Sequence, residues 1–238
     1  MDSSLHILAY EAMKLTGAEI EVALQTFDLG IVKVDVEGKY EQKEPQFSDI
    51  PLSRIYFEFR TPEHPHKPGK LTPELCTKIG RVLVRSVLQK RIHFDAIVGI
   101  PDAGTVFVDA FAKAWKEQTQ EMALRLRLIK TGEGKERFIS GIEENPEVPR
   151  GSRVLLFDDL IAHGRSKKEA VIVLRKNLYS CTDISVLLDR REGGVQELDE
   201  MGVVVHAVNT IHQYLGVYLL HHKMTVPQIR AVLAQIPL

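Results

Sequence analysis

Residues 154–168 read VLLFDDLIAHGRSKK and decide the fold of this chain. An apolar run ends in two adjacent carboxylates, Asp158 and Asp159, and a short loop around Gly164 leads into an amphipathic segment at 165–177. A continuous apolar run is typical of a strand that is buried on both faces of a parallel sheet. The stretch therefore predicts a strand, a tight turn and a helix, which together form one unit of an α/β sheet.

The same alternation of strands and helices continues on both sides of this stretch. Strands are expected at 96–100, 123–129, 153–159, 184–189 and 203–208, and helices at 72–90, 106–117, 165–177, 195–201, 210–222 and from Thr225 onward. Five β runs with intervening helices predict an α/β fold, with a mostly parallel sheet covered by helices on both faces.

The N-terminal part of the chain has a different pattern. A helix is expected from Ser3 or Ser4 until Gly17 ends it, and alternating residues predict strands at 30–36 and 55–60. We therefore predict a small hood-like N-terminal domain at 1–67 and an α/β core at 68–238. The sequence leaves open whether the first helix and the polar loop at 37–53 add a contact or a lid.

Composition excludes several classes of protein. The 238 residues include 31 basic and 32 acidic side chains, and this balance gives no electrostatic footprint for general nucleic-acid binding. Apolar runs stay short of the roughly 18 residues that a membrane span needs, and the acidic start is unlike a secretory signal. Two cysteines, Cys76 and Cys181, suggest a reducing compartment. We expect a soluble, cytoplasmic protein with no membrane or nucleic-acid partner.

The turn after Asp158 and Asp159 has the chemistry of a sugar-phosphate site. Ligands of open α/β sheets bind at the carboxyl ends of the strands, and free N–H groups at a helix start suit a phosphate. Two carboxylates would repel that phosphate unless they face hydroxyls or a divalent cation. The residues therefore favour ribose hydroxyls on the aspartates with Mg²⁺ nearby. The alternative is a DD pair that stands at an exposed strand end without a ligand.

This pattern resembles the phosphoribosyl pyrophosphate (PRPP) signature of type I phosphoribosyltransferases. In that family the paired acids contact the ribose hydroxyls and the loop binds the 5′-phosphate. The resemblance implies a PRPP site, with Mg²⁺ carried by PRPP and no metal ligand assigned directly. Its residues are Asp158, Asp159, Ala162, His163, Gly164, Arg165 and Ser166, and Ala162 and His163 stand where the family usually has Thr, Ser or Ala.

A second stretch, VLLDRREGG at 186–194, resembles the C-terminal part of orotate phosphoribosyltransferases. There an arginine binds the carboxylate and carbonyl edge of the base, and Arg190 falls on that position. A guanidinium is the best bidentate partner for a carboxylated planar ring. The alternative is that Asp189, Arg190, Arg191 and Glu192 pair with one another at the strand end.

Two further segments extend the resemblance to about residues 20–235. GIPDAG at 99–104 is similar to the family's pyrophosphate loop, which implies that Asp102 and Gly104 lie against the diphosphate. SRIYFEFR at 53–60 is similar to a family strand that reads SPIYIDLR, with Arg54 in place of proline.

The orotate enzymes also carry a mobile loop whose cations neutralise the departing pyrophosphate. This chain reads RLIKTGEG at 127–134, so Arg127 holds the arginine position, while Leu128, Thr131 and Glu133 replace the two lysines and a His or Tyr. A shift of one residue brings Lys130 onto the second lysine, and Lys135 lies within reach. A further family lysine falls on Ser48, with Lys43 the nearest earlier base. Arg127 and Lys130 are the residues expected to act on pyrophosphate, and His163, charged near neutral pH, could partly replace a missing cation.

These motifs predict a phosphoribosyltransferase of the orotate kind. The resemblance implies that it joins orotate to PRPP with Mg²⁺, giving orotidine 5′-phosphate and pyrophosphate in pyrimidine nucleotide biosynthesis, and that it acts as a homodimer. One alternative is a catalytically impaired PRPP- or nucleotide-binding protein, favoured by the missing lysines. The other is a phosphoribosyltransferase for a different base.

Overall fold

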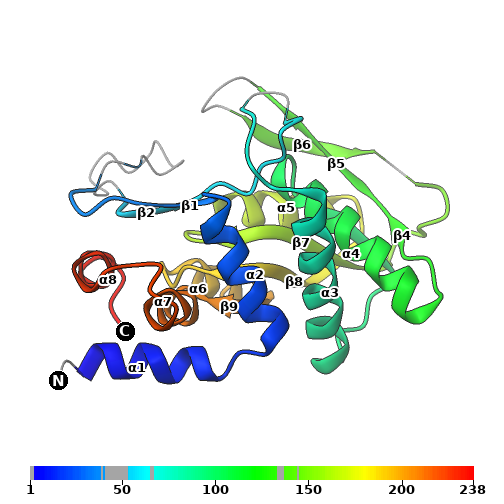
Figure 1. Cartoon of the computed structure of the whole chain (residues 1–238). Helices are drawn as coiled ribbons and strands as arrows, with labels where there is room; N and C mark the ends of the chain where they lie inside the picture. The colour runs from blue at the N-terminus through cyan, green and yellow to red at the C-terminus, as the bar shows by residue number, and fades with distance from the viewer. Residues whose placement is uncertain (1–2, 39, 41–52, 65–66, 133–136, 144) are drawn as a thin grey trace. The chain divides into compact units, whose positions relative to one another are not determined.

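The computed structural model describes residues 3–38, 40, 53–64, 67–132, 137–143 and 145–238 (Figure 1). The chain forms two compact units. One consists of Met1–Leu75 and Asn209–Leu238, and the other of Cys76–Val208. The domain boundary that we predict between residues 67 and 68 stays a prediction. None of the helices formed by the described residues is long and apolar enough to span a membrane.

The unit 76–208 is built around a five-stranded sheet with the order β4-β3-β7-β8-β9. The strand pairs β3–β4, β3–β7 and β7–β8 are all parallel. The predicted α/β fold with a mostly parallel sheet is therefore confirmed. The strands are β3 (Ala96–Gly99), β4 (Leu124–Arg125), β7 (Arg153–Ile161), β8 (Ser180–Asp189) and β9 (Val204–Thr210), and the helices are α3 (Pro73–Gln89), α4 (Ala103–Thr119), α5 (Arg165–Lys176) and α6 (Gly194–Asp199).

Helices pack against both faces of the central strand β7. On one face the ring of Phe157 lies 4.5 Å from that of Phe111 in α4, measured between centroids. On the other face Leu156 belongs to the apolar core that contains Leu174 of α5. Because successive side chains of a strand point to opposite faces, the neighbouring acids at the end of β7 also leave the strand on opposite sides.

The predicted strand at 123–129 is in fact two strands. β4 joins the parallel sheet, and β5 (Arg127–Thr131) leaves it to pair antiparallel with β6 (Phe138–Glu143), a strand that we did not predict. Leu128 and Ile139 of this hairpin are buried in the core on the α5 side. Its strands alternate only weakly in polarity, which explains why β6 was missed.

The other unit contains more helix than predicted. α1 (Ser3–Met13) ends as expected before Gly17, but α2 (Gly17–Asp28) begins there and was missed. Thr16 and Glu19 form a capping box at its start, a signal that the sequence does carry. The remaining elements are the antiparallel pair β1 (Val32–Val34) and β2 (Ile55–Phe57), α7 (Ile211–Leu220), which packs on α1, and α8 (Val226–Leu233). Thr26 of α2 and Tyr218 of α7 are joined by a buried hydrogen bond of 3.0 Å.

Candidate active site

Asp158, the first acid of the pair, is buried and neutralised from inside the protein. Lys167 Nζ donates to its Oδ2 at 2.5 Å, and both side chains are 7% exposed. Its Oδ1 accepts the N–H of Asp159 at 3.0 Å. The repulsion that two carboxylates would exert on a phosphate is thereby reduced to that of one.

Sequence reasoning missed Lys167. Three and seven residues after it come Ala170 and Leu174, which are fully buried in the core under α5. A lysine at that helical spacing lies on the buried face of an amphipathic helix, where a charged side chain needs a partner. That periodicity was the available signal, because a carboxylate stood at the end of the preceding strand.

Asp159 is the more exposed acid of the pair. It lies on the other face of β7, and its Oδ1 accepts the N–H of Leu160 at 2.7 Å. This bond orients one oxygen of the carboxylate. Asp159 is therefore the acid of the pair that is better placed to accept hydrogen bonds from a bound hydroxyl.

The predicted phosphate loop, residues 162–166, forms the turn between β7 and α5. Gly164 is the N-cap residue of α5 and has a left-handed φ of 79°, which glycine adopts at no steric cost. Since glycine has no side chain, the N-cap residue offers no capping oxygen to the first N–H groups of this 12-residue helix. Arg165 bonds to Glu169 one turn along at 3.2 Å, which directs its guanidinium along α5.

The phosphate loop is packed backbone to backbone against the predicted base-binding turn. The N–H of Gly194 donates to Ala162 O at 2.7 Å. A Cβ at Gly194 would lie 2.4 Å from Ala162 O and 2.8 Å from Gly164 N, both far inside contact distance. Only glycine at 194 therefore permits the two turns to approach this closely.

Arg190 is buried and lies in a chain of charged groups. Its Nη2 donates to Glu192 Oε1 at 2.7 Å, with side-chain exposures of 6% and 10%. The other oxygen of Glu192 is 3.7 Å from His163 Nε2, and His163 Nδ1 lies 3.0 Å from the backbone oxygen of Glu192. Arg191 in turn pairs with Asp189 at 3.3 Å. The mutual pairing that the sequence left open is thus present, and Glu192 connects Arg190 to the phosphate loop.

The GIPDAG turn at 99–104 lies against the end of β7. The N–H of Ile100 donates to Phe157 O at 2.9 Å, and a Cβ at Gly104 would come within 2.5 Å of the same oxygen and 3.1 Å of Asp158 Oδ1. Glycine at 104 therefore allows the turn to touch the acidic strand end. The peptide bond between Pro101 and Asp102 is cis.

Two cations of the β5–β6 hairpin reach this turn. Lys130 Nζ donates to Pro101 O at 3.0 Å. Arg137, which sequence reasoning did not single out, makes two bonds to the carboxylate of Asp102, at 2.7 and 3.1 Å. These bonds to Asp102 raise the pKa of Arg137, although partial burial opposes the shift.

The other predicted loop residues are placed differently. Arg127 lies at the opposite end of the β5 ladder from Thr131, with its side chain 80% exposed and Nη1 3.9 Å from Glu143. Leu128 is buried in the core. Ser48, Lys43, Glu133 and Lys135 lie outside the described residues. The structure thus brings Lys130 to the predicted pyrophosphate turn and leaves Arg127 at the far end of the hairpin.

Metal and thiol chemistry have no preformed centre in the described part of the chain. No group of three or more His, Cys, Asp or Glu residues there is arranged to hold a metal ion. No disulfide joins Cys76 and Cys181 in it either. Cys181 is buried in the core as predicted, and burial raises the pKa of its thiol to about 12, so it stays protonated at neutral pH.

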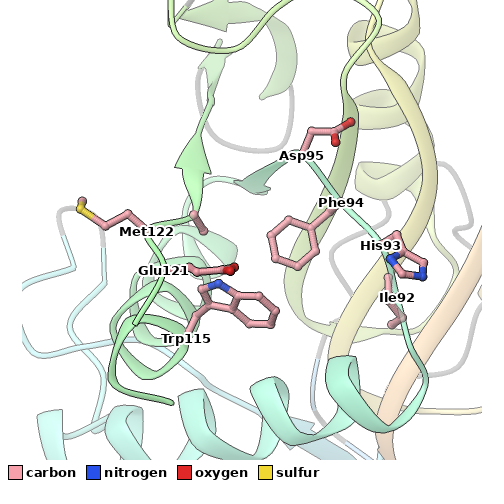
Figure 2. Close-up of a pocket in the computed structure, with 8 residues that line it drawn as sticks. Ile92, His93, Phe94, Asp95, Trp115, Glu121 and Met122 are labelled. Carbon is pink, nitrogen blue, oxygen red and sulfur yellow. The ribbon is translucent and has the colours of Figure 1, made fainter. Parts of the chain in front are cut away.

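A pocket of about 260 Å³ lies at the other end of the sheet (Figure 2). Its walls include Phe94, Asp95 and Trp115, and the two rings lie 5.1 Å apart in an edge-on arrangement. Asp95 directly precedes β3, so the pocket is at the amino end of that strand, whereas the GIPDAG turn follows its carboxyl end. Packing accounts for these aromatic residues, and the pocket is separate from the candidate site.

The three predicted motifs meet at one edge of the sheet. They follow the carboxyl ends of β3, β7 and β8, which are neighbours in the order of strands. Ligands of α/β proteins bind at this edge. The candidate active site is therefore formed by the turns 99–104, 158–166 and 189–194 together with Lys130, Arg137 and Lys167.

Comparison with known proteins identifies the family of this chain. Residues 71–218 match the model of the phosphoribosyl transferase domain family. Because that match covers more than half of the sequence, the chain belongs to this family, and the resemblance drawn from its motifs is confirmed.

Its relatives within the family are orotate phosphoribosyltransferases and uridine 5′-monophosphate synthases. The chain is 31% identical to the orotate phosphoribosyltransferase of Saccharolobus solfataricus over 144 residues, which are 60% of this chain and 69% of that protein. It is 26% identical to the uridine 5′-monophosphate synthase of Bos taurus over 204 residues, 83% of this chain and 39% of that protein. The chain thus spans well under half the length of the bovine synthase.

Solved structures show the same fold. The UMP synthase of Leishmania donovani superposes with a TM-score of 0.72 at 24% identity, covering 92% of this chain and 42% of that one. The orotate phosphoribosyltransferase of Aeropyrum pernix gives a TM-score of 0.59 at 21% identity, covering 82% and 96%. At these identities the likeness shows the fold alone.

Proposed function

We propose that this protein joins orotate to PRPP, giving orotidine 5′-phosphate and pyrophosphate. A ring nitrogen of orotate loses its proton and forms a bond to C1 of the ribose, while the bond from C1 to the pyrophosphate oxygen breaks and its electron pair leaves with pyrophosphate. The observation that supports this proposal best is the contact between the turns 162–166 and 189–194. The predicted phosphate loop and the turn that carries Arg190 are about 30 residues apart in sequence, and they share a backbone hydrogen bond of 2.7 Å.

The β7 end of the site suits the ribose and its 5′-phosphate. Asp159 would accept hydrogen bonds from the ribose hydroxyls, and the N–H groups of 162–166 would hold the phosphate at the start of α5. The ion pair with Lys167 compensates the negative charge of Asp158. Backbone N–H donors would then face the phosphate, and a single partly exposed carboxylate, that of Asp159, would face the sugar.

Mg²⁺ fits this donor set as an ion carried by the substrate. Magnesium commonly binds through one or two carboxylates, several waters and substrate phosphates. Because Asp158 is paired with Lys167, Asp159 is the carboxylate of the pair that would hold the ion. When bound with PRPP, the ion would neutralise charge on the diphosphate.

The base and pyrophosphate ends of the site carry the remaining roles. Arg190 is proposed to bind the carboxylate of orotate, which then shares or replaces its bond to Glu192. Lys130, at the GIPDAG turn, would stabilise the negative charge of the leaving pyrophosphate. A role for Arg127 stays a prediction. We also propose a homodimer, on the resemblance, and a cytoplasmic location, on the presence of two free cysteines, Cys76 and Cys181.

Two alternatives each have an observation in their favour. A PRPP- or nucleotide-binding protein with little turnover is favoured by Leu128, whose position in the core excludes a cation there. A transferase for another base is favoured by the pairing of Arg190 with Glu192. The carboxylate of Glu192 already occupies the guanidinium that would have to bind the carboxylate of orotate.

One assay separates these possibilities. Purified protein is mixed with PRPP, Mg²⁺ and orotate, and the loss of orotate absorbance is followed. Turnover supports the proposal, whereas PRPP binding without turnover favours the binding protein and turnover with a different base favours the third. Asp159→Asn should weaken PRPP binding in calorimetry, and unchanged binding would contradict the assignment of the ribose site.

A further inference from the structure

Arg137 and Lys130 extend from the two strands of one hairpin to consecutive residues of one turn. Thr131 pairs with Phe138 in the β5–β6 ladder, so Lys130, just before Thr131, and Arg137, just before Phe138, lie on either side of that pair. Lys130 contacts Pro101, and Arg137 contacts Asp102. Two positive charges are thus brought to the turn that follows β3, from the same chain that forms it.

The pair of Arg137 with Asp102 is suited to exchange. Both side chains are partly exposed, at 22% and 26%, so an anion in solvent can reach the guanidinium. The planar fork of arginine binds carboxylate and phosphate with the same bidentate geometry. If a phosphoryl group took the place of the Asp102 carboxylate as the partner of Arg137, both hydrogen bonds would keep their geometry.

The position of Asp102 makes such an exchange consequential. Asp102 is the N-cap residue of α4, yet within the described residues its side chain makes no capping hydrogen bond to that helix. Its carboxylate is instead bonded to Arg137. A carboxylate in this turn would repel a diphosphate unless a cation neutralised it, and Arg137 does so before any ligand arrives.

We propose that Arg137 is a diphosphate-binding residue of this site, which exchanges the carboxylate of Asp102 for a phosphoryl group when the ligand binds. The inference rests on the proposed function, because it takes the 99–104 turn as the place of the diphosphate. Leu128 and Thr131 stand where the orotate enzymes have lysines. Arg137, together with Lys130, would supply part of that missing positive charge from within the same chain.

The test is a double-mutant cycle read by binding of Mg²⁺-pyrophosphate in calorimetry. Arg137→Gln should weaken binding by about tenfold or more, as expected for the loss of a charge-assisted pair. Asp102→Asn should strengthen it several-fold, because a competing carboxylate is removed. The double variant should bind more weakly than Asp102→Asn alone, since the guanidinium itself contacts the ligand.

Three results would overturn the inference. Arg137→Gln could bind pyrophosphate as the unaltered protein does. The double variant could bind as tightly as Asp102→Asn, in which case Arg137 acts on Asp102 only. Or the unaltered protein could bind ribose 5-phosphate but no pyrophosphate, which would leave the phosphate loop in place while removing the ligand of Arg137.

Two controls keep folding and general charge effects apart from the role of Arg137. Arg153→Gln removes another arginine that faces an aspartate, Asp95, at the amino end of β7, and should leave pyrophosphate affinity unchanged. Arg137→Lys keeps the charge without the fork and should fall between the parent and Arg137→Gln. Ribose 5-phosphate binding should be equal in all these variants, and its absence from the unaltered protein would count against the proposed function itself.

Discussion

The turns after β7 and β3 follow neighbouring strands, yet their electrostatics differ. At the β7 turn the buried acid Asp158 has its cation, Lys167, inside the core. At the β3 turn the acid Asp102 and its cation Arg137 are both partly exposed. The first pair is shielded from a ligand and fixed, whereas the second is open to one.

Under the proposed function, this difference separates a phosphate side at the β7 turn, which would bind the sugar phosphate, from a diphosphate side at the β3 turn, from which pyrophosphate would leave. The phosphate side depends on backbone N–H groups, a buried ion pair and a close approach of glycine, all of which are set by the folded core. The diphosphate side depends on side chains of a hairpin, and its sequence has drifted from the orotate enzymes there. If the two sides differ in this way, substitutions on the phosphate side should affect mainly stability and sugar-phosphate binding, and those on the diphosphate side mainly pyrophosphate binding.

The largest effect is expected from the buried ion pair. Lys167→Met leaves the carboxylate of Asp158 buried without its cation, and breaking such a pair costs about 3–5 kcal/mol of unfolding free energy. Urea denaturation measures the loss. Lys168→Met is the matched control, because that lysine pairs with Glu197 at a more exposed position and should cost about 1 kcal/mol or less. Equal losses in the two variants would show that Asp158 is less buried than described.

A smaller effect is expected where the phosphate loop meets the base turn. Gly194→Ala forces a Cβ against Ala162 O and Gly164 N, and such overpacking costs about 1–3 kcal/mol. Because the strain falls on the loop, binding of ribose 5-phosphate should weaken as well, which calorimetry would detect.

Gly193→Ala is the comparison for that experiment. A Cβ at 193 meets nothing within 4 Å, but φ is +93°, so the variant carries backbone strain and displaces no neighbour. It should lose stability yet keep its affinity for ribose 5-phosphate. If Gly194→Ala also kept that affinity, contact between the two turns would be irrelevant to the phosphate site.

Much of the fold and one side of the site were predictable from sequence. The run before Asp158, the glycine at 164 and the alternation of strands and helices depend on local periodicity and turn chemistry, and each predicted its element. The strand β6 and the helix α2 were missed, the first because its alternation is weak and the second because Gly17 was taken only as an end.

The pairings within the candidate site were missed for different reasons. Lys167 with Asp158 spans nine residues across a turn, and Arg137 with Asp102 spans 35 residues across a hairpin. The first pairing lies within one strand-turn-helix unit, and the helical spacing of Lys167 was a signal for it that was overlooked. The second depends on where the β5–β6 hairpin returns to the β3 turn, which no local pattern states. Arg190 was recognised, but its bond to Glu192 depends on the path of the turn between them.

On the diphosphate side, Lys130→Gln should weaken binding of Mg²⁺-pyrophosphate by about tenfold, the effect of removing one charge-assisted contact. Stability should change little, because Lys130 donates to a backbone oxygen, Pro101 O, at a partly buried position. Comparison of calorimetric affinity with the urea midpoint tests both statements. A variant that unfolds more easily but binds equally well would show that Lys130 only fastens the hairpin to the turn.

Arg127→Gln should have the smallest effect, a change in pyrophosphate affinity within about twofold, since exposed ion pairs contribute little. Its side chain is 80% exposed, faces Glu143 at 3.9 Å, and lies at the end of the ladder away from Lys130. The measurement also bears on the proposed homodimer. Arg127→Gln could lower turnover strongly and still leave pyrophosphate affinity unchanged, because Lys130 and Arg137 are intact. In that case Arg127 acts on the site of a second subunit. Mixing this variant with an inactive Asp159→Asn chain would then restore activity in the mixed dimers, whereas a role within one chain predicts no recovery.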